Sequence, residues 1–324
     1  MIRSATLYSY EIPRILPQQA HRKGIVIQWT HIDGDTVWSE TSPLPLWSVE
    51  TFEDALKQLM LLIPKLKYQP CAKVLTTLPS HLFPSVHFGI CSAMNYFLSD
   101  RICERLSLPI SGLLLGSYSE ILKQISLLDS SGFVHVKLKT SQLSVDEAIW
   151  ITQHLKKKYK LRIDMNQNWK PNECMQYLKN FSESDFDYIE EPPTNCQLTS
   201  FPIALDESLR MMEPISLPSL GNLRAIVIKP TLSKILFSTP TLISEAVSNG
   251  KIVSLSSSFE SGIGLYHIGR LAKHLSLTSF PLGLDTNKYF CRDLLVTPHH
   301  IQGGMVDLSF PKPNINLLKK IADV

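Results

Sequence analysis

Hydrophobic and polar residues follow two different rhythms along this chain. Near its start, alternation with a period of two residues over 3–12 and 24–40 predicts β-strands, and the Asp33-Gly34 dipeptide predicts a hairpin turn inside the second stretch. Apolar residues at helical spacing follow these strands, over 50–65 and 86–104. Strands followed by helices predict a small α+β domain over residues 1–100.

From about residue 105 onward, short apolar runs alternate with amphipathic stretches such as 144–158 and 241–249. The runs are "VHVKLK", "YKLRIDMN", "FDYIEE", "FPIALDES", "RAIVIKP" and "IVSLSSS". This alternation predicts parallel β/α units, in a number that suits a (β/α) barrel, although an open doubly wound sheet has the same rhythm. No G-x-G-x-x-G follows any run, which disfavours a dinucleotide-binding sheet.

Composition narrows the functional classes. The 324 residues are 44% hydrophobic, which is enough for a large core, and the formal charge of +3 is too even for binding nucleic acid through its phosphates. The six cysteines form no C-x-x-C pair and predict reduced thiols that pack in the interior of a cytoplasmic protein. We see neither a secretory pattern nor an apolar run of membrane-spanning length, and we expect no membrane, nucleic-acid or protein partner.

Two lysines in "FVHVKLKT", Lys137 and Lys139, flank a single leucine. In a strand they emerge on one face, where each ammonium group disfavours the protonated form of the other. A lysine acts as a base only when it is neutral. We therefore hypothesise that one lysine tunes the other.

Polar residues end the later runs, where a barrel places its catalytic loops. They are Asp164 and Asn166, Glu190 and Glu191, Asp206 and Glu207, and Lys229. Singly, each has an ordinary explanation as a helix start or a strand exit. Together, three carboxylates on one rim would repel unless a cation lay between them, and oxygen ligands without a nearby His or Cys set favour Mg²⁺, or Mn²⁺, over zinc.

The combination K-x-K, D-x-N, E-E-P, D-E-S and a strand-end lysine resembles the enolase superfamily, in the subgroup with lysines on two opposed strands. A narrower likeness, to the o-succinylbenzoate synthase family, extends from residue 3 to about residue 290. The segments that carry it are "SATLYSYEIP", "WSETSPLP", "PSVHFGICSA", "LRIDMNQNW", "VIKPTL", "SSSFESGIGL" and "GLDT".

This resemblance implies an α/β fold of the enolase superfamily. A modified TIM barrel, (β/α)₇β, would occupy 101–290, beneath an α+β capping domain at 1–100, and residues 291–324 would return to the cap. The implied cofactor is Mg²⁺, with Mn²⁺ as the other candidate, and the implied partner is a small-molecule carboxylate.

The resemblance also implies roles for single residues. Asp164, Glu190 and Asp206 would bind the metal, Lys139 would remove a proton and then help hydroxide leave, and Lys229 would stay protonated and stabilise an enediolate. Supporting or substrate-binding roles fall to Lys137, Asn166, Arg162, Ser256, Ser257, Ser258 and Glu260. The implied reaction dehydrates 2-succinyl-6-hydroxy-2,4-cyclohexadiene-1-carboxylate to 2-succinylbenzoate in menaquinone synthesis.

Several of these assignments have alternatives. The three serines fit an ordinary turn as well as a carboxylate-binding loop, and Arg162 fits an interior ion pair as well as a support of the metal site. His21, Arg22 and Lys23 either reach the substrate from the first connection of the cap or form a solvated basic loop. An N-succinylamino acid racemase or dipeptide epimerase would use the same scaffold, and a non-catalytic barrel is the alternative from another class.

Overall fold

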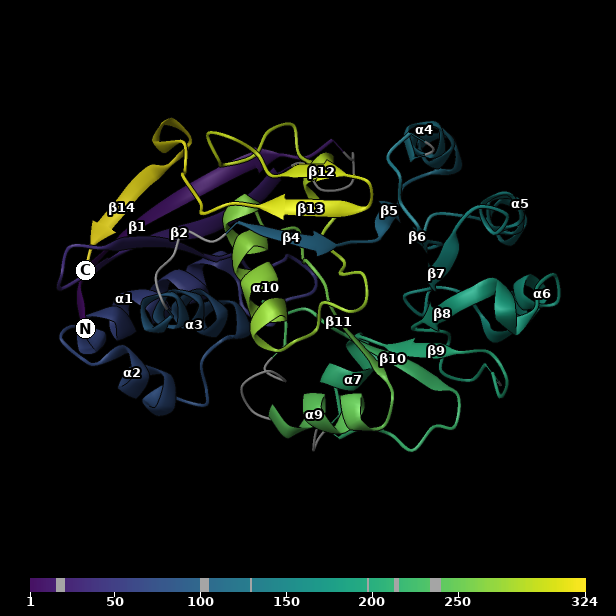
Figure 1. The fold of residues 1–324 in the computed structure, drawn as a ribbon, viewed down its shortest axis with the longest axis horizontal. Coiled ribbons are helices and arrows are strands. Elements are labelled where there is room, and N and C mark those ends of the chain that lie inside the picture. Colours follow the sequence, from purple (N-terminus) through teal and green to yellow (C-terminus); the bar gives the residue numbers. More distant parts are fainter. Residues whose placement is uncertain (16–20, 100–104, 129, 197, 213–215, 234–239) are drawn as a thin grey trace.

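The computed structural model describes residues 1–324 apart from 16–20, 100–104, 129, 197, 213–215 and 234–239. Figure 1 shows a sheet covered by helices at one end of the molecule and strands ringed by helices at the other. In chain order the strands and α-helices are β1 (Ile2–Pro13), β2 (His21–His31), β3 (Thr36–Thr41), α1 (Phe52–Leu66), α2 (Cys71–Thr77), α3 (Pro84–Leu98), β4 (Leu106–Pro109), β5 (Gly112–Leu114), α4 (Tyr118–Leu128), β6 (His135–Lys139), α5 (Val145–Leu155), β7 (Lys160–Asp164), α6 (Pro171–Leu178), β8 (Phe186–Glu190), β9 (Ile203–Leu205), α7 (Glu207–Arg210), β10 (Leu223–Ile228), α9 (Pro240–Ser248), β11 (Ile252–Leu255), α10 (Gly262–His274), β12 (His300–Gln302), β13 (Met305–Leu308) and β14 (Lys319–Asp323).

The first part of the chain forms an antiparallel sheet of order β14-β1-β2-β3. As predicted, β2 and β3 form a hairpin that turns at Asp33-Gly34, where Gly34 takes a φ of 96° that suits glycine. Helix α1 starts at a capping box, because the Thr51 hydroxyl accepts from the Asp54 N–H at 3.1 Å while the Thr51 N–H donates to the Asp54 carboxylate at 3.0 Å. The apolar face of the sheet, including Trp29, is buried against α1 and α3.

The second sheet is the barrel. Its seven strands are parallel, in the order β11-β10-β9-β8-β7-β6-β5. A two-residue segment, Leu282–Gly283, closes the ring. The Gly283 N–H donates to the carbonyl of Leu255, the last residue of β11, at 3.0 Å, and the Ser111 N–H, directly before β5, donates to the Leu282 carbonyl at 3.0 Å. The predicted alternative of an open doubly wound sheet is therefore wrong.

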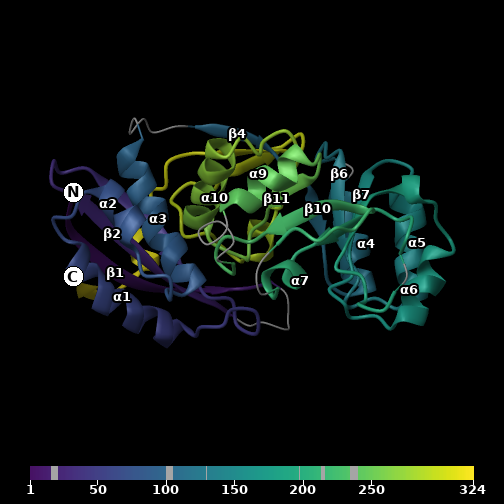
Figure 2. The same ribbon diagram turned by 90° about the horizontal axis from the view of Figure 1, so that it is seen from below.

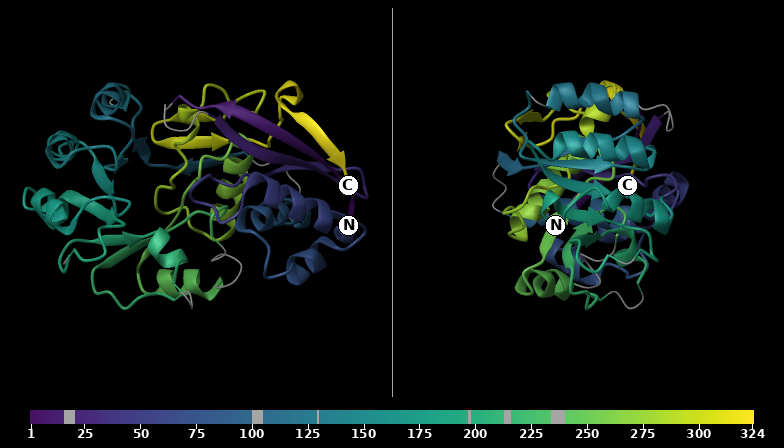
Figure 3. Two further views of the ribbon diagram at one scale, coloured as in Figure 1. Left: turned by 180° about the vertical axis from the view of Figure 1, so that it is seen from behind. Right: turned by 90° about the vertical axis from the view of Figure 1, so that its right-hand side faces the viewer.

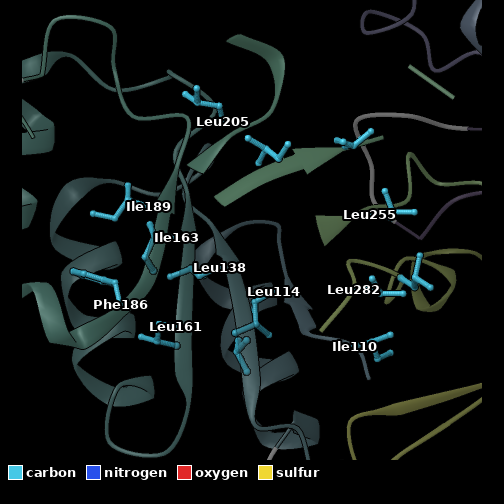
Figure 4. Close-up of a cluster of buried hydrophobic side chains, with 14 of the residues drawn as sticks. Ile110, Leu114, Leu138, Leu161, Ile163, Phe186, Ile189, Leu205, Leu255 and Leu282 are labelled. Carbon is cyan, nitrogen blue, oxygen red and sulfur yellow. The ribbon is translucent and has the colours of Figure 1, made fainter. Parts of the chain in front are cut away.

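Side chains alternate between the two faces of the barrel strands. Leu138, Ile163 and Ile189 are fully buried between the strands and the outer helices, as Figure 4 shows. Helices α4, α5 and α6 lie outside β6 and β7 (Figure 2). Residues next to these leucine and isoleucine side chains in sequence, such as Lys137 and Lys139, therefore point into the barrel.

The last part of the chain contacts both sheets. Strands β12 and β13 form a three-stranded antiparallel sheet with β4, and β14 pairs with β1. Both chain termini consequently lie at the same end of the molecule (Figures 1 and 3). No helix in the described part of the chain is long and apolar enough to cross a membrane.

Two sequence-based expectations need correction. The second predicted helix of the cap, 86–104, ends earlier, because α3 stops at Leu98; residues 100–104 lie outside the described part. The cysteines are not all interior packing residues, since Cys291 is exposed, although the five described cysteines are free thiols. Cys103 lies outside the described residues.

A buried carboxylate links the cap to the barrel. Glu40, on β3, is fully buried and accepts hydrogen bonds from the Ser261 hydroxyl at 2.6 Å and the Gly264 N–H at 3.0 Å, at the start of α10. The Tyr10 hydroxyl of β1 donates to the same carboxylate at 2.5 Å. Because the first N–H groups of a helix lack partners within that helix, a carboxylate there satisfies them and complements the helix dipole.

We predict that Glu40→Gln lowers the free energy of unfolding by about 1–3 kcal/mol, since the amide cannot accept all of these hydrogen bonds. Urea denaturation followed by circular dichroism measures this change. Glu53→Gln is the control, because the Glu53 side chain on α1 is 74% exposed. Equal stability of Glu40→Gln and the wild type would contradict the assigned link.

Candidate active site

The predicted metal ligands and lysines meet inside one end of the barrel. Lys137 and Lys139 belong to β6, and Lys229 directly follows β10. In the ring of seven strands and the closing segment, β6 and β10 are opposite each other, with β7, β8 and β9 between them. Asp164, Glu190 and Asp206 end or follow those three intervening strands.

A cavity of about 260 Å³ opens at this end of the barrel. Its lining combines barrel residues with residues of the cap loop, the connection between β3 and α1. The lining residues are Leu44, Trp47, Ser111, Leu113, Leu115, Gly116, Lys137, Lys139, Ser141, Gln142, Asn166, Lys229, Leu232, Ser256, Ser257, Ser258, Phe259, Gly283, Asp285 and Thr286. A larger cavity of about 360 Å³ lies between α3 and α10, but none of the predicted site residues lines it. The chemistry therefore concentrates at the barrel end.

Lys137 contacts two of the three carboxylates. Its ammonium nitrogen lies 2.7 Å from both oxygens of Glu190 and 2.9 Å from Asp164 Oδ2. Burial lowers the pKa of Lys137, but these two carboxylates outweigh burial and raise that pKa well above its usual value. The neighbouring carboxylates, rather than the second lysine of the pair, therefore decide the charge of Lys137, and the hypothesis that one lysine tunes the other stays a prediction.

The carboxylates interact with one another as well. Burial, and then the nearby Asp164 carboxylate, raise the pKa of Glu190 to about 7. Burial also raises the pKa of Asp164, but Lys137, Lys139 and Lys229 outweigh burial and hold that pKa well below its usual range. Burial thus dominates the pKa of Glu190, whereas the three lysines dominate the pKa of Asp164.

Lys139 and Lys229 contact different carboxylates on opposite sides of the barrel mouth. The Lys139 ammonium group donates to Asp164 Oδ2 at 2.7 Å and to Asn166 Oδ1 at 2.9 Å. The Lys229 ammonium group forms an ion pair with Asp206. Burial lowers the pKa of Lys229, but Asp206 and other carboxylates outweigh burial and raise it.

The donor set fits Mg²⁺ in its chemistry. The side chains of Asp164, Glu190 and Asp206 are at most 3% exposed and offer only oxygen atoms, which hard divalent cations prefer. As they stand, these carboxylates face lysine ammonium groups, and among the described residues no three His, Cys, Asp or Glu side chains are grouped to hold an ion. Metal binding would require them to turn from the lysines toward a shared ion.

The three consecutive serines of "SLSSSFESG" line the cavity. They belong to residues 256–261, which follow β11 and are called the serine loop below. The Ser257 hydroxyl donates to Glu260 at 2.7 Å and contacts the Thr286 hydroxyl at 2.8 Å. The Ser258 hydroxyl is buried and has no hydrogen-bond partner among the described residues. Ser258 thus differs from Ser257, whose hydroxyl already has two partners.

Two predicted supporting residues lie outside the cavity lining. Glu260 is fully buried and accepts from the Ser258 N–H at 2.6 Å and from the Thr231 hydroxyl, so it supports the serine loop. Arg162 donates to the Asp187 carboxylate at 2.9 Å and to the Pro281 carbonyl at 2.7 Å, deeper in the barrel. The ion-pair alternative for Arg162 is therefore the one that the structure shows.

Sequence reasoning missed Trp47 and the position of Arg22. Trp47 comes from the cap loop and lines the cavity, with the Lys229 ammonium nitrogen 5.8 Å from the centre of its indole ring. Arg22 is not part of a solvated loop: it lies on β2, is 1% exposed and donates to the Phe259 carbonyl at 2.9 Å. Residues 16–20 of the first cap connection lie outside the described part. A tryptophan in a loop has no sequence signal for this role, since only the docking of cap on barrel brings it to the cavity.

Comparison with known proteins identifies the family. The model for the MenC N-terminal domain matches residues 2–97, and the model for the enolase C-terminal domain-like family matches residues 120–217. The o-succinylbenzoate synthase of Vibrio cholerae serotype O1 (strain M66-2) is 31% identical over 92% of this chain and 93% of its own length. The chain belongs to the o-succinylbenzoate synthase family. It is accordingly a hydro-lyase of the enolase superfamily, and the predicted fold class is confirmed.

Two other proteins of this family are similar to the chain over most of its length. The o-succinylbenzoate synthase of Pasteurella multocida (strain Pm70) is 29% identical over 88% of this chain and 90% of its own. MenC from Desulfotalea psychrophila LSv54 is 19% identical and has a TM-score of 0.75 over 94% of this chain and 99% of its own.

Two further solved structures, one of them of a racemase, share the fold. An enolase superfamily member from Roseovarius nubinhibens ISM, complexed with magnesium, has a TM-score of 0.74 at 18% identity over 100% of this chain and 99% of its own. The N-succinyl Arg/Lys racemase of Bacillus cereus ATCC 14579 has a TM-score of 0.77 at 16% identity over the same shares. At these identities the likeness supports the fold alone.

We predict that Lys137→Met lowers the free energy of unfolding by about 3–5 kcal/mol in a chelating buffer, because it leaves Asp164 and Glu190 buried without their shared cation. Urea denaturation measures this loss. Lys156→Met is the control, since the Lys156–Asp185 ion pair is 31% and 18% exposed and contributes less than about 1 kcal/mol. A Lys137→Met protein as stable as the wild type would show that the cluster does not depend on Lys137.

Proposed function

We propose that this protein catalyses the reaction for which its family, o-succinylbenzoate synthase, is named. It would dehydrate 2-succinyl-6-hydroxy-2,4-cyclohexadiene-1-carboxylate to 2-succinylbenzoate, a step of menaquinone biosynthesis. The observation that carries the proposal is the placement of two lysines on opposite strands of the barrel, with three buried carboxylates on the strands between them. The family membership supports the same reaction.

The first step is removal of the proton next to the substrate carboxylate by Lys139. This proton is only weakly acidic, because its removal puts further negative charge on the carboxylate group. Lys139 is 22% exposed at its side chain and lines the cavity, so its amine can reach a bound substrate. The same amine, once protonated, is the acid that helps the hydroxyl group leave as water.

Lys229 is the electrostatic partner in this step. Its ammonium group faces the cavity from the opposite strand, where positive charge stabilises the developing enediolate. The raised pKa of Lys229, which burial lowers and Asp206 restores, keeps it protonated at neutral pH. A lysine that stays charged suits this role better than the role of a second base.

Asp164, Glu190 and Asp206 would hold Mg²⁺, with Asn166 and Lys137 in support. Bound there, the ion would supply a Lewis acid for the substrate carboxylate oxygens. The three side chains are buried and offer only oxygen atoms, which hard divalent cations prefer, and this supports Mg²⁺ at this place. Ser256, Ser257 and Ser258 would hold the second carboxylate of the substrate on the other wall of the cavity.

A substrate panel tests the proposal. The purified protein is assayed with Mg²⁺ against the cyclohexadiene acid, through loss of its ultraviolet absorbance, and against N-succinyl amino acids and dipeptides, through exchange of the α-proton for deuterium. We expect turnover of the diene, its loss in excess chelator and its return with added Mg²⁺. Rapid α-exchange with an untouched diene would instead identify a racemase or epimerase, and no turnover of any substrate would favour a non-catalytic barrel.

We predict that Lys139→Ala folds normally and lowers kcat by about 10²–10⁴-fold, the usual contribution of a general base. Steady-state kinetics measure the loss, and circular dichroism checks the fold. Lys123→Ala, at an exposed position of α4, is the matched control and should keep wild-type rates. Near-native turnover by Lys139→Ala would remove Lys139 from the mechanism.

A further inference from the structure

Glu191 directly follows the proposed ligand Glu190, yet its side chain serves a different set of contacts. It is 1% exposed, and its carboxylate accepts four hydrogen bonds from groups beyond the ends of β7 and β9. The donors are the Asp206 N–H at 2.6 Å, the Ser208 N–H at 2.9 Å, the Ser208 hydroxyl at 2.5 Å and the Gln167 side-chain amide at 2.7 Å. Glu191 therefore joins three successive strand ends of the barrel.

All four donors to this carboxylate are neutral groups. Among the residues that the structure describes, no lysine or arginine lies within ion-pair distance of Glu191, in contrast to its neighbour Glu190. Hydrogen bonds from N–H and O–H groups to a carboxylate are shorter and stronger than those between neutral groups. The arrangement thus fixes backbone and side chains around Glu191 without adding a cation.

The backbone on both sides of this contact adopts a sparsely populated conformation. Asn166, Gln167 and Glu191 have φ values of 43°, 55° and 46°, in the left-handed region that residues other than glycine seldom occupy. The Gln167 N–H donates to the Glu191 carbonyl at 2.9 Å, and the Glu191 N–H donates to the Ala204 carbonyl at 3.0 Å. Residues persist in such conformations where surrounding contacts hold them, commonly at functional sites.

We propose that Glu191 is a positioning residue for metal binding: by holding the Asp206 N–H and the residues that follow, it fixes the backbone position from which the Asp206 carboxylate can turn from Lys229 to the ion. This inference rests on the assignment of Asp206 as a metal ligand under the proposed function. Groups that orient metal ligands commonly change metal affinity about 10–100-fold when they are altered. Loss of the Glu191 carboxylate would leave the Asp206 and Ser208 N–H groups without this acceptor and let the backbone at Asp206 shift.

The test measures Mg²⁺ binding by titration calorimetry with the metal alone. Glu191→Gln and Glu191→Ala should raise the dissociation constant for Mg²⁺ about 10–100-fold. Because Glu191 does not line the cavity, saturating Mg²⁺ should restore most of the wild-type kcat. Glu50→Gln is a matched control: Glu50 is a buried carboxylate of the cap that accepts from the Ser85 N–H at 3.2 Å and the Ser85 hydroxyl at 2.5 Å, and its loss should lower the melting temperature without changing Mg²⁺ affinity.

Unchanged Mg²⁺ affinity in folded Glu191 variants would overturn the proposal, as would an equal loss of affinity in Glu50→Gln. If neither Glu191 variant folds, Ser208→Ala decides, because it removes one donor to Glu191 and leaves the carboxylate; wild-type affinity there also overturns the proposal. Asp206→Asn is titrated in parallel. Should Asp206→Asn bind Mg²⁺ like the wild type, the assigned metal site is wrong; should it bind weakly while the Glu191 variants bind normally, only the role of Glu191 is wrong.

Discussion

The burial of carboxylates inside the barrel is the constraint on which this structure depends. An ionised carboxylate is costly in a low-dielectric interior unless positive charge or several hydrogen-bond donors accompany it. Here Asp164 and Glu190 share the ammonium group of Lys137, and even so the pKa of Glu190 is raised to about 7 by burial and by its acidic neighbour. Lys139 and Lys229 contact Asp164 and Asp206 in the same way, so a cluster of buried carboxylates and lysines occupies one end of a barrel whose strands pack apolar side chains against the outer helices.

Buried charges also attach the cap to the barrel. Glu40 satisfies the start of α10, and Arg22 donates to the carbonyl groups of Phe259, on the serine loop, and of Ser42, at 2.5 Å, next to the loop that carries Trp47. Each charged group joins segments that are far apart in sequence. The cap thereby closes the cavity through fixed contacts rather than through apolar packing alone.

Much of this organisation could be predicted from the sequence. Period-two alternation around Leu138 placed both lysines on the inner face, and the spacing of the acids placed them on successive strands, because strand geometry leaves only two choices for each side chain. Cap contacts such as Trp47 beside Lys229 could not be predicted, since they depend on how two separate sheets dock. The charge of Lys137 could not be predicted either. A neighbouring lysine alone would lower its pKa, whereas in the folded protein Asp164 and Glu190 raise it.

The closing segment of the barrel has a consequence of its own. Gly283 completes the ring and also lines the cavity, and a side chain at that position would collide with the Ser256 side chain. The segment that closes the barrel therefore also forms part of the cavity wall. Evolution can reshape this wall to suit another ligand only through changes that keep the ring shut, so new specificities within this lineage should arise more readily from the cap side.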